Sequence, residues 1–342
     1  MRIAVIGSGS WGCALCAVLA EKGHDVCLWS YFPEESKMLE KDRENKKNLP
    51  GLILPENVTY TSDLKTAAEG TELFVIVTPS STVGATAKGL SPFVKEGAIM
   101  VCASKGFDPE SKKMLTETIK MHIPQATVAA LSGPSHAEEV AKKLPTTLVA
   151  ACENQETAYF LQDLFMTDYL RIYAGDDVIG VELGGALKNI IALCAGVSDG
   201  LGFGDNTKAA LMTRGMTEMA RLGLAMGAKL STFSGLSGMG DLIVTCTSMH
   251  SRNRRAGILL GQGKTAEEAQ KEVGMVVEGV YAAKEAYEIA KKLGVEMPIT
   301  QQAYRLLFEG ATAKEAVEAL MNREKRHESD NGFVINEGKD TE

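Results

Sequence analysis

The chain has no disulfide framework, no excess of positive charge and no long uninterrupted apolar run. Its seven cysteines are scattered over 342 residues, and only Cys13 and Cys16 form a C-x-x-C pair. A single C-x-x-C pair gives only weak support for a zinc site. An odd number of cysteines without the spacing of a disulfide framework is typical of a protein in a reducing cytosol. No run reaches the ~18 apolar residues of a membrane span. We therefore expect a cytoplasmic protein without a metal site and without stable membrane insertion.

The charge balance excludes a second group of functions. The formal net charge is −8, which argues against general affinity for nucleic acid or anionic membranes. The N-terminus resembles a signal peptide because Arg2 precedes an apolar run, but three glycines interrupt that run. The composition is that of an ordinary soluble globular protein, and the length predicts about two domains.

Short apolar runs alternate with helical patterns in the first half of the chain. Because these runs are continuous, they predict strands buried on both faces, and hence a mostly parallel sheet covered by helices. The predicted strands cover residues 2–7, 26–29, 72–79, 98–104, 126–134, 146–151 and 170–174. We therefore expect an α/β domain over residues 1–175.

The pattern changes after Asp176. Residues 181–201 form a long, nearly all-apolar helical stretch, and strand signals vanish. Further helices are predicted over residues 207–227, 256–262, 265–273, 278–293, 299–308 and 312–321. We expect an all-helical domain over residues 176–322 and, because residues 323–342 are polar and aperiodic, a disordered tail.

A glycine motif follows the first predicted strand. Gly7, Gly9 and Gly12 form G-x-G-x-x-G between that strand and a helix, and a second strand follows, as a Rossmann dinucleotide fold requires. Gly7 would permit the tight turn, Gly9 the approach of a pyrophosphate, and Gly12 close packing of helix on strand. The motif predicts NAD or NADP as the cofactor.

The choice between the two nucleotides stays open. An acidic residue at the end of the second strand binds the ribose of NAD, whereas an arginine accepts the 2′-phosphate of NADP. This chain has Ser30, Tyr31 and Phe32 there, with Glu34 slightly beyond. Tyr31 and Phe32 could flank an adenine ring or belong to the core.

Lys188 stands on the most apolar helix. Three of its four neighbours at three and four positions are small residues, among them Gly184 and Gly185. A lysine beside such unfilled space can have a lowered pKa and exchange protons near neutrality. A lysine that snorkels at an interface fits the local sequence equally well.

Two further segments place polar residues after predicted strands. Lys105 lies at the carboxyl end of a strand, where open α/β sheets bind ligands. Residues 133–135 make a turn after the next strand, and a helix is predicted from Ala137 onward. His136 between them is expected to be structural or helix-initiating.

Asp241 and Thr245 lie one helical turn apart and so share a helix face. Beside Lys188, Asp241 could orient or tune the amine. It could instead be only a negative charge at a helix start.

The segment SRNRRAG, residues 251–257, places cations at a helix start. Ser251 fits an N-cap, yet Arg252, Arg254 and Arg255 follow in a turn that already carries partial positive charge. Such a cluster is more often a solvated face than a site. An anionic ligand is the functional alternative.

Together these motifs resemble those of the NAD(P)-dependent glycerol-3-phosphate dehydrogenases, close to the bacterial type. The resemblance runs from Met1 to about Asn322 and rests on GSGSWG, SKG, LSGPSHAEEV, ELGGALKNIIALCAG, GLSGMGDLIVTCTS, SRNRRAG and VEGVYAA. It implies a Rossmann domain followed by a helical domain. It also implies an oxidoreductase that interconverts dihydroxyacetone phosphate and sn-glycerol 3-phosphate with NAD(P)H and supplies phospholipid synthesis.

The resemblance further implies residue roles. Lys188 would be the general acid/base, completed by Lys105 and Asp241. The implied substrate-binding residues are Lys105, Gly133, Ser135, Lys188, Asn189, Asp241, Thr245, Ser251, Arg252 and Asn253. The implied dinucleotide-binding residues are Gly7, Gly9, Ser10, Trp11, Gly12, Tyr31, Phe32, Lys105, Ala137, Arg252, Val276 and Glu278. Many relatives carry Arg or His near position 31, so Tyr31 weakens any inference of NADP preference.

A phosphate would supply the negative charge that SRNRRAG lacks. Ser251 would cap the helix while Arg252 and Asn253 close on the anion, and Arg254 and Arg255 would shape the field or face solvent. Two alternatives stay open. A β-hydroxyacid dehydrogenase would bind a carboxylate there, and a nicotinamide-binding sensor would have no need of the catalytic group. We expect the apolar helix to be domain core, and a homodimer is left open.

Overall fold

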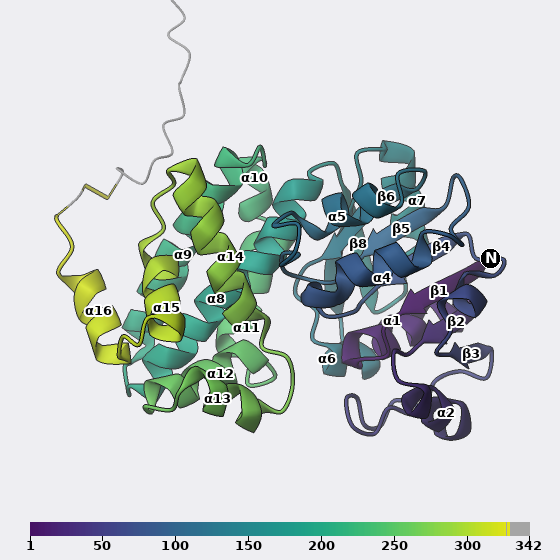
Figure 1. The fold of residues 1–342 in the computed structure, drawn as a ribbon, viewed down its shortest axis with the longest axis horizontal. Helices are drawn as coiled ribbons and strands as arrows, with labels where there is room; N and C mark the ends of the chain where they lie inside the picture. The colour runs from purple at the N-terminus through teal and green to yellow at the C-terminus, as the bar shows by residue number, and fades with distance from the viewer. Residues whose placement is uncertain (326, 329–342) are drawn as a thin grey trace, which may run out of the picture.

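The computed structural model describes residues 1–325, 327 and 328, which form a sheet lobe and a helical lobe side by side (Figure 1). The sheet has eight strands in the order β3-β2-β1-β4-β5-β6-β7-β8. The strands are β1 Arg2–Ile6, β2 Asp25–Trp29, β3 Val58–Thr61, β4 Leu73–Ile76, β5 Ile99–Cys102, β6 Thr127–Ser132, β7 Thr146–Ala151 and β8 Leu170–Gly175.

The expected α/β class with a mostly parallel sheet is confirmed. All neighbouring strands are parallel except β6 and β7, where Ser132 lies opposite Val149 in an antiparallel pair. Continuous apolar runs mark the central strands because helices cover both faces. Strand β3 was not predicted, since it lies at the sheet edge and only Val58 of its four residues is buried.

Helices of the sheet lobe connect the strands. They are α1 Ser10–Glu21, α2 Pro33–Asp42, α3 Leu64–Ala68, the 3-10 turn η1 Ser80–Thr82, α4 Val83–Leu90, α5 Leu115–His122, α6 Ala137–Ala141 and α7 Gln155–Phe165. Cys13 and Cys16 both lie in α1 and are buried, and burial raises the pKa of each thiol, for Cys13 to about 12. These two thiols are therefore packed in the core in their protonated form.

The helical lobe begins directly after β8. Its helices are α8 Val178–Gly200, α9 Asp205–Ala225, α10 Leu230–Phe233, the π-helical turn η2 Leu236–Gly240, α11 Asp241–Thr247, α12 Arg252–Gly261, α13 Ala266–Val273, α14 Glu278–Leu293, α15 Pro298–Phe308 and α16 Ala313–Met321. The segments α10 and η2 were not predicted because each is too short to show helical periodicity. Helix α11 contains the helical turn expected between Asp241 and Thr245.

Helix α8 forms the centre of the helical lobe and packs against α9, α11, α12 and α14. Among the described helices it is the one long and apolar enough to cross a membrane. The expectation that no segment reaches that length was therefore wrong. Its most apolar 18-residue window is 83% buried inside the protein, which is the environment of a core helix.

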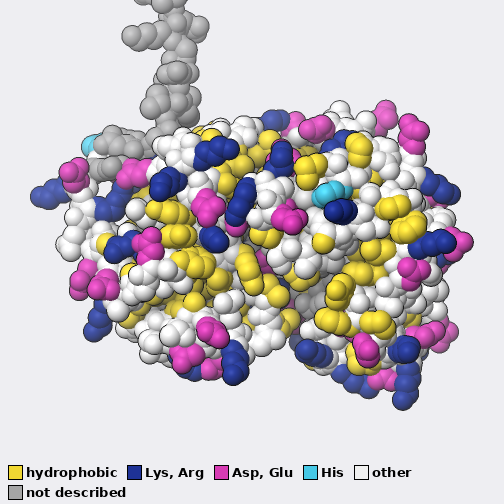
Figure 2. Space-filling view, in the orientation of Figure 1, with side chains coloured by type: hydrophobic (Ala, Val, Ile, Leu, Met, Phe, Trp, Pro, Cys, Tyr) yellow, Lys and Arg dark blue, Asp and Glu magenta, His cyan; other side chains and the backbone are white. Residues whose placement is uncertain are grey.

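The predicted disordered tail, residues 323–342, lies mostly outside the described residues, which end at Glu328. On the face shown in Figure 2, basic and acidic side chains are interspersed rather than gathered into a basic patch. This mixed face agrees with the acidic net charge.

Candidate active site

The glycine loop joins β1 to α1 and has the geometry of a phosphate cradle. Gly7 has φ +121°, which is accessible to glycine, and its N–H donates to the carbonyl of Trp29 at 3.0 Å. A Cβ on Gly12 would lie 1.9 Å from the Gly7 oxygen, whereas a Cβ on Gly9 would meet nothing within 4 Å. Gly12 is thus fixed by packing, while Gly9 leaves open space in front of the helix start.

The start of α1 leaves its first backbone N–H groups free for an anion, and no acidic side chain lies in that turn. The cradle therefore fits the pyrophosphate of a dinucleotide. Of the other residues expected there, Ser10 opens α1 and Trp11 is partly buried against the sheet core.

Tyr31 and Phe32 follow β2 and are exposed, at 73% and 60%. Their rings contact each other edge-on at 5.1 Å. The core alternative for these residues is therefore wrong, and an adenine-flanking role stays a prediction. Nearby, Glu35 accepts hydrogen bonds from the Ser8 hydroxyl at 2.9 Å and from Asn45 at 3.0 Å. Sequence reasoning missed this carboxylate beside the glycine loop.

A buried cluster of charges lies where the two lobes meet. Lys188 Nζ lies 2.5 Å from one carboxylate oxygen of Asp241, and Lys105 Nζ lies 2.6 Å from the other. Lys188 also donates to the Thr245 hydroxyl at 2.7 Å. Lys188 is 6% exposed and Asp241 1%. We call Lys105, Lys188, Asp241 and Thr245 the lysine centre; four residues from three separate segments meet there.

The charges of the lysine centre are mutually dependent. Burial, together with the charge of Lys105, lowers the pKa of Lys188 to about 8, although the carboxylate of Asp241 opposes the shift. Burial alone would raise the pKa of Asp241, but the ammonium groups of Lys105 and Lys188 hold it below its ordinary value. The centre therefore holds a fixed carboxylate beside an amine that can exchange a proton near neutral pH.

Two glycines of α8 let this centre form. A Cβ on Gly184 would lie 2.3 Å from the backbone oxygen of Ser237 in η2. A Cβ on Gly185 would lie 2.8 Å from the Ser132 hydroxyl and 3.3 Å from Cγ of Lys105. The unfilled space that the sequence indicated beside Lys188 is thus occupied by neighbouring backbone and by the Lys105 side chain.

The loop after β6 supports Lys105. Lys105 Nζ donates to the Gly133 carbonyl at 3.0 Å, and the Ser135 hydroxyl donates to the same oxygen at 3.0 Å. Gly133 has φ +136°. A Cβ on Gly240 would lie 3.6 Å from the Pro134 ring, so this loop packs against the turn that leads to Asp241.

Asparagines connect the lysine centre to the start of α12. Asn253 donates to the side-chain oxygen of Asn189 at 2.9 Å and accepts from the Gly279 N–H at 2.8 Å. Ser251 is the N-cap of α12, as expected, and its hydroxyl accepts from the Arg254 N–H at 3.2 Å. The helix start therefore lies beside the residue that follows Lys188.

The three arginines of α12 have different environments. Arg254 pairs with Asp199 at 2.8 Å and donates to the Thr247 carbonyl, so a protein carboxylate compensates this cation. Burial lowers the pKa of Arg252, and the charge of Glu278 opposes that shift. The Nε of Arg255 is buried and has no hydrogen-bond partner among the described residues.

Glu278 connects the helical lobe to the sheet lobe at the carboxyl end of β4. Its carboxylate accepts from the Ser80 backbone N–H at 3.1 Å and from the Ser80 hydroxyl at 2.5 Å, just after the carboxyl end of β4. Ser80 was not predicted, although it follows a strand in the sequence TPSS. Val276 is 37% exposed before α14, and Ala137 is buried at the start of α6.

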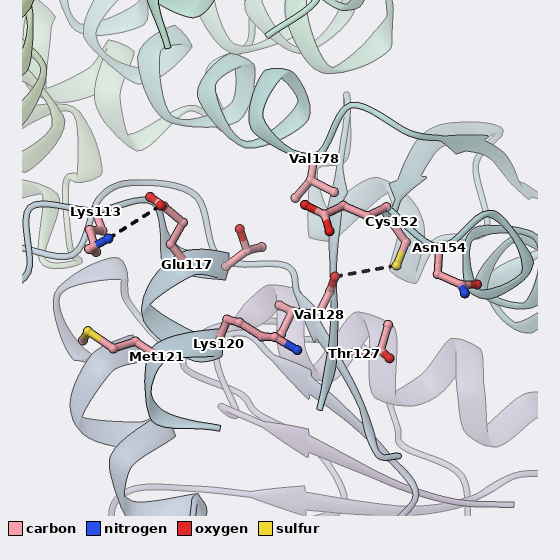
Figure 3. Close-up of a pocket in the computed structure, with 11 residues that line it drawn as sticks. Lys113, Glu117, Lys120, Met121, Thr127, Val128, Cys152, Asn154 and Val178 are labelled. Carbon is pink, nitrogen blue, oxygen red and sulfur yellow. Dashed lines mark hydrogen bonds and ion pairs between the residues drawn. The ribbon is translucent and has the colours of Figure 1, made fainter. Parts of the chain in front are cut away.

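A separate cavity of about 670 Å³ does not contain this site (Figure 3). Its lining includes Lys113, Glu117 and Lys120 of the α5 region, together with Cys152. Lys113 pairs with Glu117, and the Cys152 thiol donates to the Val128 carbonyl. In the part of the chain that the structure describes, no group of three His, Cys, Asp or Glu residues is placed to hold a metal ion.

Known proteins share this architecture along nearly the whole chain. The family descriptions "NAD-dependent glycerol-3-phosphate dehydrogenase N-terminus" and "C-terminus" match residues 2–158 and 177–318. Glycerol-3-phosphate dehydrogenase (NAD(P)+) of Clostridium perfringens strain SM101 is 54% identical over 327 residues, covering 96% of this chain and 99% of that protein. The corresponding protein of Agathobacter rectalis is 51% identical, covering 96% and 97%.

Solved structures agree. The crystal structure of glycerol-3-phosphate dehydrogenase from Coxiella burnetii has a TM-score of 0.91 and 40% identity, covering 94% of this chain and 99% of that one. A D-mandelate dehydrogenase structure with NADH matches at a TM-score of 0.61 but only 14% identity, which shows the fold alone.

The Rossmann sheet with its glycine cradle, joined to a helical lobe that carries a buried lysine, defines a nicotinamide-dependent dehydrogenase. Within this class, the family models and relatives match the glycerol-3-phosphate dehydrogenases. They confirm the family and the NAD(P) cofactor class that the sequence motifs indicated. The chain belongs to the NAD-dependent glycerol-3-phosphate dehydrogenase family.

Proposed function

We propose that this protein interconverts dihydroxyacetone phosphate and sn-glycerol 3-phosphate by hydride transfer with NAD(P)H. The observation that carries the proposal is the buried lysine centre, connected through the Asn189–Asn253 hydrogen bond to the serine-capped start of α12. A small molecule with a ketone at one end and a phosphate at the other matches both features.

Lys188 acts as the general acid in this proposal. As the carbonyl oxygen gains negative charge, Lys188 Nζ donates a proton to it, and in the reverse direction the neutral amine takes the proton from the hydroxyl group. Lys105 stabilises the developing charge, and Asp241 keeps both amines oriented. When bound, the nicotinamide supplies or accepts the hydride, so the protein contributes positioning and proton transfer.

The phosphate would lie at the start of α12. It would be held there by Ser251, Arg252 and Asn253. The rest of the substrate would contact Gly133, Ser135, Asn189 and Thr245. The residues that would hold the dinucleotide are those of the glycine loop together with Ala137, Arg252, Val276 and Glu278, and Tyr31 and Phe32 would flank the adenine. The free N–H groups at the α1 start and the open space at Gly9 support the nucleotide position.

The biological setting belongs to the same proposal. We infer a cytoplasmic enzyme that supplies glycerol 3-phosphate for phospholipid synthesis, without stable membrane insertion, with a dinucleotide domain over residues 1–175 and a catalytic domain over residues 176–322. A homodimer is an additional proposal, to be tested by the mass of the protein in solution.

Steady-state rates test the proposal. We expect reduction of dihydroxyacetone phosphate with NADH or NADPH at an efficiency far above that of unphosphorylated dihydroxyacetone. Equal efficiency for the two ketones would overturn the assignment and favour a dehydrogenase for another substrate. Nucleotide binding without turnover of either ketone would favour a sensor.

A further inference from the structure

His136 carries a buried ring nitrogen that the fold leaves unpaired. Its Nε2 finds no hydrogen-bond partner among the residues that the structure describes. The residue precedes α6 in the N-cap position, yet its side chain makes no capping hydrogen bond. Helix initiation therefore does not explain the ring. Because a buried polar atom without a partner costs free energy, a ligand atom is a reasonable partner for Nε2.

The ring lies where the two lobes face each other. Its centroid is 5.6 Å from that of His250, with an angle of 52° between the planes. His250 directly precedes the N-cap Ser251, and His136 directly follows Ser135 in the loop that anchors Lys105. The two histidines thus connect the loop after β6 to the start of α12.

The environment of His136 favours the neutral form of the imidazole. Burial lowers the pKa of His136, and the charge of Lys188 on α8 lowers it further. Glu138 and Glu139 of α6 oppose the shift, and His250 adds to it. A neutral ring can still donate one N–H without adding another cation next to the lysine centre.

We propose that His136 is a further substrate-binding residue, which donates a hydrogen bond to the phosphate of the ketone substrate. His250 is a positioning residue that holds the ring in place. The phosphate is the preferred partner because the lysine centre already serves the carbonyl end and because His250 adjoins Ser251 and Arg252. The inference rests on the proposed function and adds a contact from the sheet lobe to a phosphate otherwise held by α12.

Substitution of His136 tests the proposal in the full-length enzyme. In His136→Leu the KM for dihydroxyacetone phosphate should rise roughly tenfold, because a hydrogen bond to a charged group is lost. The KM for NADH and the efficiency with unphosphorylated dihydroxyacetone should stay unchanged. His136→Gln keeps a side-chain N–H donor and should recover a large part of the affinity. His122→Leu, at the end of α5, is the matched control and should behave as wild type.

Inorganic sulfate provides a second readout. It stays a dianion across the working pH range, and its competitive inhibition constant should rise in His136→Leu and recover in His136→Gln. If His136→Leu leaves the KM for dihydroxyacetone phosphate unchanged, or impairs both ketones equally, the contact is refuted while the proposed function stands. If wild type itself shows no preference for the phosphorylated ketone, the proposed function fails and the inference fails with it.

Discussion

The two ends of the candidate site are built from different parts of the chain. The glycine loop consists of backbone within one short segment, Gly7 to Gly12, and leads into the start of helix α1. The lysine centre consists of buried charged side chains from segments far apart, such as Lys105 and Asp241, 136 positions apart. The first end can be recognised locally, whereas the second exists only after the two lobes pack together.

In the proposed function, this difference separates nucleotide binding at the glycine loop from proton transfer at the lysine centre. A change in the lysine centre should act on kcat, and a change in the glycine loop should act on nucleotide affinity. A lysine-centre variant that changed only nucleotide affinity, or a glycine-loop variant that changed only kcat, would contradict this division.

The largest effect is expected for Lys188→Ala. Loss of the proton donor should lower kcat by about 10²–10⁴-fold. The dissociation constant for NADH, measured by fluorescence titration, should stay close to that of wild type because the glycine loop is distant in sequence and intact. Unchanged turnover would mean that another group donates the proton.

The next effect is expected for Asp241→Asn. This variant removes the carboxylate that both lysines contact, so kcat should fall by roughly 10²-fold because the two amines lose their orientation. Breaking the buried pair should also lower the stability of the fold by ~3–5 kcal/mol. Because the Asp241 charge raises the pKa of Lys188, its loss should also move the alkaline decline of the reduction rate to lower pH. Thermal denaturation would show whether enough folded enzyme remains, and a decline at the wild-type position would contradict the coupling.

The arginines of α12 should differ in their effects. Arg252→Ala should raise the KM for dihydroxyacetone phosphate by roughly 10-fold or more, because it loses a charge-assisted contact. Arg255→Ala should change that KM much less. Arg254→Ala should lower thermal stability through the loss of the Asp199 pair without changing the preference for the phosphorylated ketone. Equal losses of substrate affinity in Arg252→Ala and Arg255→Ala would show that the phosphate contacts are assigned wrongly.

The smallest catalytic effect is expected in the glycine loop. Gly9→Ala places its Cβ in open space, so the protein should fold normally and its KM for NADH should rise by about tenfold or less, since the methyl group meets the pyrophosphate. Gly12→Ala is the contrasting variant, because its Cβ would collide with the Gly7 carbonyl and should destabilise the fold. Folding assays on both variants separate nucleotide contact from helix packing.

The sequence predicted what depends on local pattern. The buried strands, the glycine cradle, the N-cap at Ser251 and the shared face of Asp241 and Thr245 all follow from spacing. Edge strand β3 was missed because it has no continuous run of buried residues. The antiparallel orientation of β7 relative to β6 was also missed, because no pattern within the strand's own sequence indicates its direction. For Tyr31 and Phe32 the sequence could not decide between a core position and a position beside an adenine ring, because the exposure of a side chain depends on the rest of the fold.

Contacts between distant segments could not be predicted. The Arg254–Asp199 ion pair partly answers why three arginines are tolerated at one helix start, and it joins residues 55 positions apart. The Ser80–Glu278 contact spans 198 positions. The pairing of His136 with His250 belongs to the same class, since neither residue's neighbours in sequence indicate the other.

The pH dependence of kcat/KM for reduction of dihydroxyacetone phosphate tests the central claim most directly. Burial brings the pKa of Lys188 to about 8, and the protonated amine is the form that donates a proton. The rate should therefore be level below that pH and fall about tenfold per pH unit above it, while glycerol 3-phosphate oxidation rises over the same range. Reduction that stays level to pH 10, with oxidation equally flat, would contradict the assignment of Lys188 as the proton donor.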